Sequence, residues 1–281
     1  MNLKRQIIST VSLSAITLNL LFWIPALIVI ALLKAIVRQS TIINVLDSIV
    51  DQIYRAAVWF DHLWLTRVLK IKLDVHGVVP ADRLSNCIVI SNHRSWFDIL
   101  LLQSMVVRKG PLLMFLIKQE LIYVPVVGWI CLALNFPRLN RGKSEQGRDR
   151  DYASVANASR RPGALMNFIE GTRFTPEKHD RQESEYRHLL KPRSGGFRVM
   201  LQNLPEVPIF DFTLAYPKDG LTFWQCLNGE HLDYQVYINM FQASEIPEDP
   251  TEWLAKRWQE KDQLLANRNS ASPDSRVIIN R

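Results

Sequence analysis

The chain has 281 residues, of which 48% are hydrophobic and 22% are charged. These ordinary fractions exclude a disordered chain and a transporter with many membrane spans. Lysine and arginine outnumber aspartate and glutamate by 34 to 27, and the net charge of +7 favours an anionic partner, either a nucleic acid, an acidic membrane surface or a phosphorylated small molecule.

The N-terminal segment is apolar enough to cross a membrane. Residues 11–33 carry no charge, and a spanning helix needs about 20 apolar residues. No small-residue cleavage site follows, so we do not expect its removal as a signal peptide. Residues 42–69 predict an amphipathic helix. Pro25 interrupts the apolar run, and the basic flanks are nearly equal, so the positive-inside rule gives no orientation. One span with an interfacial helix and a two-helix element in one leaflet both stay open, beside a helical hairpin within the protein core.

The rest of the chain alternates short apolar runs with polar helical stretches. Such runs are typical of strands covered on both faces, and they lie at residues 87–90, 112–117, 132–136, 164–169, 207–216 and 232–241. The pattern predicts an α/β fold with a mixed central sheet wrapped by helices. We expect a membrane helix and an amphipathic helix over 1–69, a globular domain over 70–266 with a closing helix after Asp249, and a flexible tail over 267–281.

The three cysteines lie apart from one another and among apolar or mixed neighbours. Cys87, Cys131 and Cys226 form no Cys-x-x-Cys pair, so they predict buried thiols in a reducing compartment. No spacing suggests a metal ligand set. We therefore expect neither a metal nor a cofactor.

The stretch ISNHRSWFDIL, residues 90–100, sets His93 five positions before Asp98 where an apolar strand ends. One interpretation is structural, a loop followed by a capping box of Ser95 and Asp98. The other is catalytic, because ligands bind at the carboxyl edge of an open α/β sheet and side chains in the first turn of a helix lean back toward its start. A carboxylate on one imidazole nitrogen leaves the other to take a proton from a substrate hydroxyl.

Further motifs follow in a fixed order. The second motif is K-x-x-L-x-x-x-P-x-x-G-W from Lys118 together with FPRLNR, which ends at Arg141; the third is FIEGTR over 168–173 and the fourth is LPEVPIF over 204–210. Together with NHRSWFD they resemble the four-motif signature of the 1-acylglycerol-3-phosphate acyltransferase (PlsC-like) family, over about residues 70–215. The stretch LLKPRSGGF, residues 189–197, resembles the lysocardiolipin-acyltransferase-like bacterial branch of that family.

The resemblance implies that residues 70–266 are an acyltransferase catalytic domain. Its reaction would move a fatty acyl group from acyl-CoA or acyl carrier protein, as co-substrate, to the free hydroxyl of a lysophospholipid, first of all 1-acylglycerol-3-phosphate, giving phosphatidic acid. His93 would be the general base and Asp98 its orienting partner. The residues implied to contact substrate are Asn92, Lys118, Arg138, Arg141, Glu170, Gly171, Thr172 and Arg173.

Within that set the assigned roles differ. Arg141 and the block Glu170 to Arg173 would hold the glycerol phosphate, and Arg138 could share or replace the role of Arg141 because Pro137 and Asn140 depart from the usual motif. Lys118 would stabilise an oxyanion or the phosphates of the donor. The structural alternatives are surface charges for the lysine and arginines, and a helix cap for Glu170.

Other functions stay open at this point. The acceptor could be lysocardiolipin or a lipid of the lysophosphatidylinositol type, the protein could be a non-catalytic lipid-binding membrane module, or the same pair could activate water in a lipid hydrolase. Charges alternate in sign from Arg138 to Arg161, so we expect no nucleic-acid partner. The expected partners are both lipid substrates, the membrane and acyl carrier protein. The expected location is a bacterial inner membrane, with the catalytic domain on the cytoplasmic side.

Overall fold

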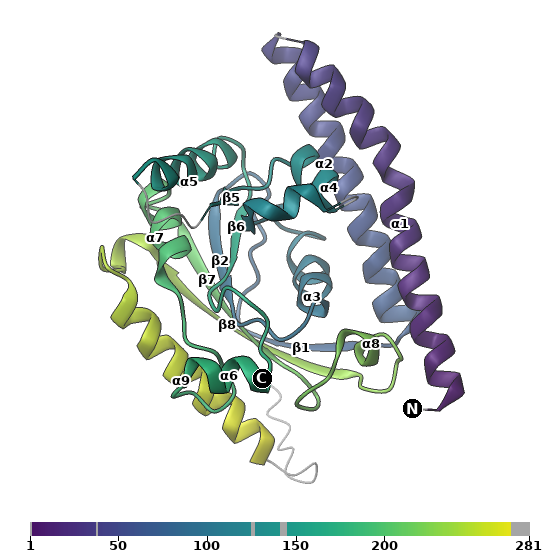
Figure 1. The fold of residues 1–281 in the computed structure, drawn as a ribbon. Coiled ribbons are helices and arrows are strands. Elements are labelled where there is room, and N and C mark those ends of the chain that lie inside the picture. The colour runs from purple at the N-terminus through teal and green to yellow at the C-terminus, as the bar shows by residue number, and fades with distance from the viewer. Residues whose placement is uncertain (1, 38, 125–126, 141–144, 271–281) are drawn as a thin grey trace.

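The computed structural model describes residues 2–37, 39–124, 127–140 and 145–270 (Figure 1). Its N-terminal part is a pair of helices, α1 (Leu3–Ile36) and α2 (Ser40–Leu63), which run side by side in opposite directions. The buried amide of Asn19 donates to the Ala57 carbonyl at 2.9 Å and to Asp61 Oδ1 at 3.0 Å. These bonds fix the pairing of the two helices, because a buried polar group left without a partner is costly.

The outer face of α1 is apolar and open. Phe22 is 72% exposed and Leu32 is 60% exposed, which excludes a helix buried in the protein core. Within the described residues, α1 is the one helix whose length and composition would allow it to cross a membrane. The helix pair, which we call the hairpin, therefore exposes an apolar surface on the outside of the protein.

The hairpin is tied to the rest of the protein near both of its ends. At the start of α1, Arg5 Nη1 donates to the Asn228 carbonyl at 3.0 Å and Ser9 Oγ donates to the Trp224 carbonyl at 2.8 Å. Near the tip, Arg161 pairs with Asp47 of α2 at 2.7 Å. The hairpin thus lies along the globular domain rather than projecting from it.

The domain is built on a six-stranded sheet in the order β1-β8-β7-β2-β6-β3. The strands are β1 (Lys72–His76), β2 (Cys87–Ser91), β3 (Leu113–Phe115), β6 (Ala164–Phe168), β7 (Pro208–Ala215) and β8 (Asp233–Gln242). All neighbours are parallel except β7 and β8, which are antiparallel. The predicted mixed sheet is confirmed, and two short parallel strands, β4 (Ile117–Lys118) and β5 (Arg138–Leu139), form a separate ribbon.

Helices cover both faces of the sheet. They are α3 (Phe97–Val106), α4 (Val127–Ala133), α5 (Glu145–Ala158), α6 (Pro176–Gln182), α7 (Ser194–Asn203), α8 (Phe223–Cys226) and α9 (Thr251–Ser270). In Figure 1, α3 and the hairpin lie on one side of the sheet, and α7 and α9 lie on the other. The three cysteines are buried free thiols, as predicted.

Two sequence predictions need correction. The apolar run 132–136 is not a strand: Leu132 and Ala133 end α4, and Asn135 takes a left-handed φ of 54° that reverses the chain before β5. Short apolar runs fit a buried helix as well as a strand, so periodicity could not separate them. The predicted tail also begins too early, because α9 continues through residues 267–270.

Candidate active site

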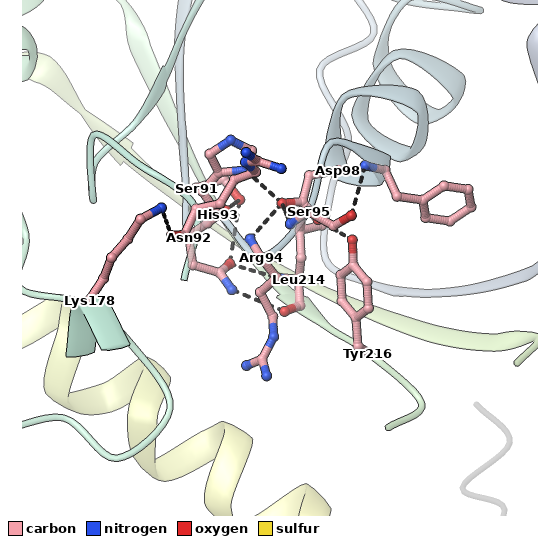
Figure 2. A network of polar contacts seen from close by, with 11 residues as sticks. Ser91, Asn92, His93, Arg94, Ser95, Asp98, Lys178, Leu214 and Tyr216 are labelled. Atoms are coloured by element: carbon pink, nitrogen blue, oxygen red, sulfur yellow. Dashed lines mark hydrogen bonds and ion pairs between the residues drawn. The ribbon is translucent and has the colours of Figure 1, made fainter. Parts of the chain in front are cut away.

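His93 and Asp98 are held together by the loop between β2 and α3. His93 Nδ1 lies 2.8 Å from Asp98 Oδ2, and the same oxygen accepts the backbone N–H groups of Arg94 at 2.7 Å and Ser95 at 2.9 Å (Figure 2). The bond from the Ser95 N–H is one half of the predicted capping box; the other half is not formed, because the Asp98 N–H donates to the Ser95 carbonyl and not to its hydroxyl. The capping and pairing interpretations of this stretch are therefore compatible in one geometry.

The second oxygen of Asp98 is bound by a residue that the sequence did not reveal. Tyr216, which directly follows β7, donates its hydroxyl to Asp98 Oδ1, and Figure 2 shows it approaching the loop from a different side than His93. Asp98 is fully buried. Burial, followed by the charge of Asp98, raises the pKa of Tyr216 well above its ordinary value, so the phenol keeps its proton and acts as a donor.

The imidazole of His93 is fixed by stacking as well as by hydrogen bonding. Its ring lies on Phe168 with centroids 3.8 Å apart and planes 11° from parallel. The edge of Trp96 closes another side at 6.5 Å. His93 is only 8% exposed, and in the part of the chain that the structure describes Nε2 has no hydrogen-bond partner. Nε2 is consequently the nitrogen that can meet a substrate hydroxyl.

Asn92 is placed to hold the loop rather than to contact a substrate. Its side-chain N–H donates to the Leu214 carbonyl at 3.1 Å, and its Oδ1 accepts the Leu214 N–H at 2.8 Å. The residue is fully buried. The expectation that Asn92 binds substrate is not supported by this geometry, because both ends of its amide are used by β7.

The sequence EGTR forms a tight turn that packs against the His93 loop. Ile169 N–H donates to the Ser91 carbonyl at 3.1 Å, and Phe174 N–H donates to the His93 carbonyl at 2.8 Å. Gly171 has a φ of 67°, in the left-handed region that glycine adopts without strain. These bonds bring two motifs that are about 75 residues apart to one edge of the sheet, as ligand binding there requires.

Glu170 is the exception within this turn. Its side chain is fully buried, and neither carboxylate oxygen has a hydrogen-bond partner among the described residues. Burial raises the pKa of Glu170 well above its ordinary value, while the positive charge of Arg94 and the nearby His93 N–H act in the opposite direction. Contact between this carboxyl and a substrate, which the resemblance implied, stays a prediction.

Beyond Glu170 the turn carries positive charge. The guanidinium of Arg173 lies 4.9 Å from the centre of the Trp96 ring. Lys178 Nζ donates to Thr172 Oγ1 at 2.9 Å and to the Arg173 carbonyl at 3.0 Å, so the predicted ligand Thr172 is engaged within the protein. Burial, then the charges of Arg173, Arg181 and Lys118, lower the pKa of Lys178. The lysine thus lies among like charges.

Of the second predicted motif, which contains Lys118, Arg138 and Arg141, the fold brings only Lys118 near the EGTR turn. Lys118 in β4 is paired with Leu139 in β5 and is near enough to act on Lys178. Arg138 donates its backbone N–H to Ser154 Oγ at 2.9 Å, and across the described chain its guanidinium makes no contact with the EGTR turn. Arg141, also predicted to bind the acceptor, lies outside the described residues.

Two cavities adjoin these residues. An apolar cavity of about 270 Å³ lies between the hairpin and α3 and includes Trp96, Ile99 and Phe115 in its wall. A polar cavity of about 780 Å³ lies beside the turn and is lined in part by Phe168 and Gly171. Within the described ranges, no group of three or more His, Cys, Asp or Glu side chains could hold a metal ion.

Comparisons with known proteins agree with this arrangement. The family model described as "Acyltransferase" matches residues 72–215, and the model "Acyltransferase C-terminus" matches residues 225–268. The 1-acyl-sn-glycerol-3-phosphate acyltransferase delta of Bos taurus is 32% identical over 219 residues, which cover 71% of this chain and 58% of the relative. The protein of the same name from Homo sapiens is 33% identical, covering 63% and 51%.

A plant relative and a solved structure extend the match along the chain. The 1-acyl-sn-glycerol-3-phosphate acyltransferase 2 of Brassica oleracea is 26% identical and covers 89% of this chain and 70% of the relative. The chain thus spans 51–58% of the mammalian relatives and more of the plant one. The crystal structure of PlsC, the 1-acyl-sn-glycerophosphate acyltransferase from Thermotoga maritima, covers 89% of this chain and 95% of its own with a TM-score of 0.50. At 16% identity, that likeness concerns the fold.

Proposed function

The chain belongs to the acyltransferase family, and from that premise we propose that it transfers a fatty acyl group from a thioester to the free hydroxyl of 1-acylglycerol-3-phosphate, giving phosphatidic acid. The observation that carries the proposal is the His93–Asp98 pair, 2.8 Å apart, beside a turn whose cations have no carboxylate partner in the described structure. A base and an anion site next to each other are what this transfer needs.

The protein groups supply general-base catalysis. His93 Nε2 takes the proton of the acceptor hydroxyl, and the oxygen attacks the thioester carbonyl carbon. The tetrahedral intermediate collapses by breaking the C–S bond, and the leaving thiolate takes the proton back from the imidazolium. Asp98, held by its donors, keeps a proton on Nδ1 and stabilises the imidazolium. Because the acceptor is itself the nucleophile, no acyl-enzyme intermediate is formed.

The acceptor phosphate is held by the cations of the turn. Arg173 presents a planar guanidinium, which suits two charge-assisted hydrogen bonds to a phosphate. Lys118 adds a second positive charge near the same place. Since Trp96 touches both Arg173 and His93, the bound phosphate would lie within one head group's length of the base.

The apolar cavity accounts for the fatty acyl chain. Its wall includes Trp96 and Phe115, and the Phe115 ring lies 6.0 Å from that of Phe168, which stacks on His93. A chain buried there gains about 0.8 kcal/mol for each CH₂ group. The donor is a thioester of coenzyme A or of acyl carrier protein, since both present the same reacting group.

The hairpin supports attachment to a membrane surface. Its exposed apolar face and its ties to the domain near both ends favour a two-helix element lying in one leaflet over a span. Three buried free thiols suit the reducing side of a membrane. We accordingly place the domain on the cytoplasmic face of a bacterial inner membrane.

The proposal is tested with a panel of acceptors and a labelled acyl donor, given both as acyl-CoA and as acyl carrier protein thioester. Label in phosphatidic acid is expected. Label found only in the acylated products of lysocardiolipin or lysophosphatidylinositol would show that the acceptor is that lipid and not 1-acylglycerol-3-phosphate. Release of fatty acid regardless of acceptor would indicate a hydrolase. Vesicle binding without any transfer would indicate a non-catalytic lipid-binding module.

A further inference from the structure

Lys178 lies outside the four motifs, yet the fold brings it to the active site. It is placed on α6, and its ammonium reaches back to Thr172 Oγ1 at 2.9 Å and to the Arg173 carbonyl at 3.0 Å. The cap of α6 fixes this approach, because the Thr175 side chain accepts the backbone N–H of Lys178 at 3.3 Å. Two of the three ammonium hydrogens are thereby used, and the third is left for a ligand.

The charges that act on Lys178 are mostly positive, and the Glu177 carboxylate opposes them only in part. Arg173, Arg181 and Lys118 are near enough for their charges to act on it. In the described structure none of these four cations has an ion-pair partner. Like charges gathered beside a partly buried site raise the free energy of the empty protein, and an anionic ligand removes that cost.

We propose that Lys178 is an acceptor-binding residue that, with Arg173 and Lys118, makes the site prefer a phosphomonoester over a phosphodiester head group. The inference rests on the proposed function and sharpens its acceptor. A phosphomonoester presents three terminal oxygens and carries a charge near −2 at neutral pH. A phosphodiester presents two terminal oxygens and one charge. Three cations around one phosphate therefore match the monoester better.

The test is Lys178→Gln in the full chain. Glutamine keeps an N–H donor on a side chain one bond shorter than lysine, and it removes the positive charge. We expect kcat/KM for 1-acylglycerol-3-phosphate to fall by about tenfold or more, chiefly through KM, because a hydrogen bond to a charged group is lost. Transfer to lysophosphatidylglycerol, a phosphodiester, should change by less than about threefold, so the ratio of the two acceptors shifts.

Two further variants separate charge from structure. Lys178→Arg retains the charge and should keep most of the preference for the monoester. Lys256→Gln, at an exposed lysine of α9, removes one charge elsewhere and should leave both acceptors unaffected. An equal loss for both acceptors in Lys178→Gln leaves their ratio unchanged; that result would overturn the role of Lys178 in selection and reduce it to a support for the turn.

A binding measurement keeps this inference distinct from the proposed function. The probe is a lysophosphatidic acid analogue lacking the free hydroxyl, titrated into wild-type protein and Lys178→Gln in detergent. Weaker binding to the variant supports the role of Lys178 even if no acyl transfer is found. Equal binding to both proteins, with transfer intact in the wild-type protein, would reject the role of Lys178 and leave the proposed function standing.

Discussion

The His93 loop and the EGTR turn are neighbours that treat charge in opposite ways. The Asp98 carboxylate is met by four donors, from His93, from two backbone N–H groups and from Tyr216. Arg173 and Lys178, which follow Gly171, have no ion-pair partner among the described residues. The first region is complete before a substrate arrives, as a preorganised catalytic group should be. The second is completed by the ligand.

The largest loss of acyl transfer should come from a change in the His93 loop, the region that is complete without substrate. His93→Ala removes the base and should lower acyl transfer by about 10²–10⁴-fold, the usual contribution of general-base catalysis. Initial rates with saturating 1-acylglycerol-3-phosphate measure it. His76→Ala is the control, since His76 is exposed on β1 and stacks on Tyr237 instead. Transfer by His93→Ala within threefold of the wild-type rate would exclude the proposed base.

A smaller effect is expected from the incomplete region. Arg173→Gln should raise KM for the acceptor and lower kcat/KM by about 10–100-fold, because one charge-assisted hydrogen-bonding group is lost. Added salt should also raise the KM of the wild-type protein more than that of the variant. Steady-state kinetics at several salt concentrations give both values. A fall in kcat at unchanged KM would place Arg173 with the catalytic groups, against the contrast drawn here.

The sequence was most informative where a site is local in the chain. The strand end at Ser91, the loop and the first turn of α3 lie within ten residues, so His93 and Asp98 could be paired from local rules alone. The mixed sheet was likewise predictable from runs covered on both faces.

Local rules could not supply the surroundings of residues whose partners are distant in the chain. Tyr216 meets Asp98 from 118 positions away, and its only signal was a tyrosine at the end of a predicted strand. Asn92 was assigned to substrate because its partner on β7 depends on how β2 and β7 pair. Glu170 is buried by the same packing. Motif spacing carries no information on burial.

Tyr216→Phe tests how finely the complete region is adjusted. The change keeps the ring and removes one donor to Asp98, so kcat should fall by about three- to tenfold with little change in KM. Steady-state kinetics with 1-acylglycerol-3-phosphate measure both values. An unchanged kcat would mean that the Tyr216 hydroxyl is not needed to hold the Asp98 carboxylate during transfer.

Glu170→Gln should have the smallest effect on transfer. It tests a buried carboxyl group that belongs neither to the His93–Asp98 pair nor to the cations of the EGTR turn. Burial raises the pKa of Glu170, so below the ordinary carboxyl pKa the folded and unfolded chains are both protonated and there is no penalty. As pH rises, the unfolded chain ionises while the folded one stays neutral. Wild-type stability is thereby lost by about 1.4 kcal/mol per pH unit until the folded pKa is reached.

Glutamine does not titrate, so the stability advantage of Glu170→Gln over the wild-type protein should grow as the pH rises above the ordinary carboxyl pKa toward the raised pKa of the folded protein. Thermal midpoints in detergent across that range measure it. Glu177→Gln serves as control, because contacts with its own N–H and with Thr175 lower the pKa of Glu177, which gives the opposite sign. If Glu170 is instead ionised beside Arg94, its replacement will lower the free energy of unfolding as the pH rises. Glu170 would then be a buried carboxylate whose charge is compensated within the protein, as that of Asp98 is.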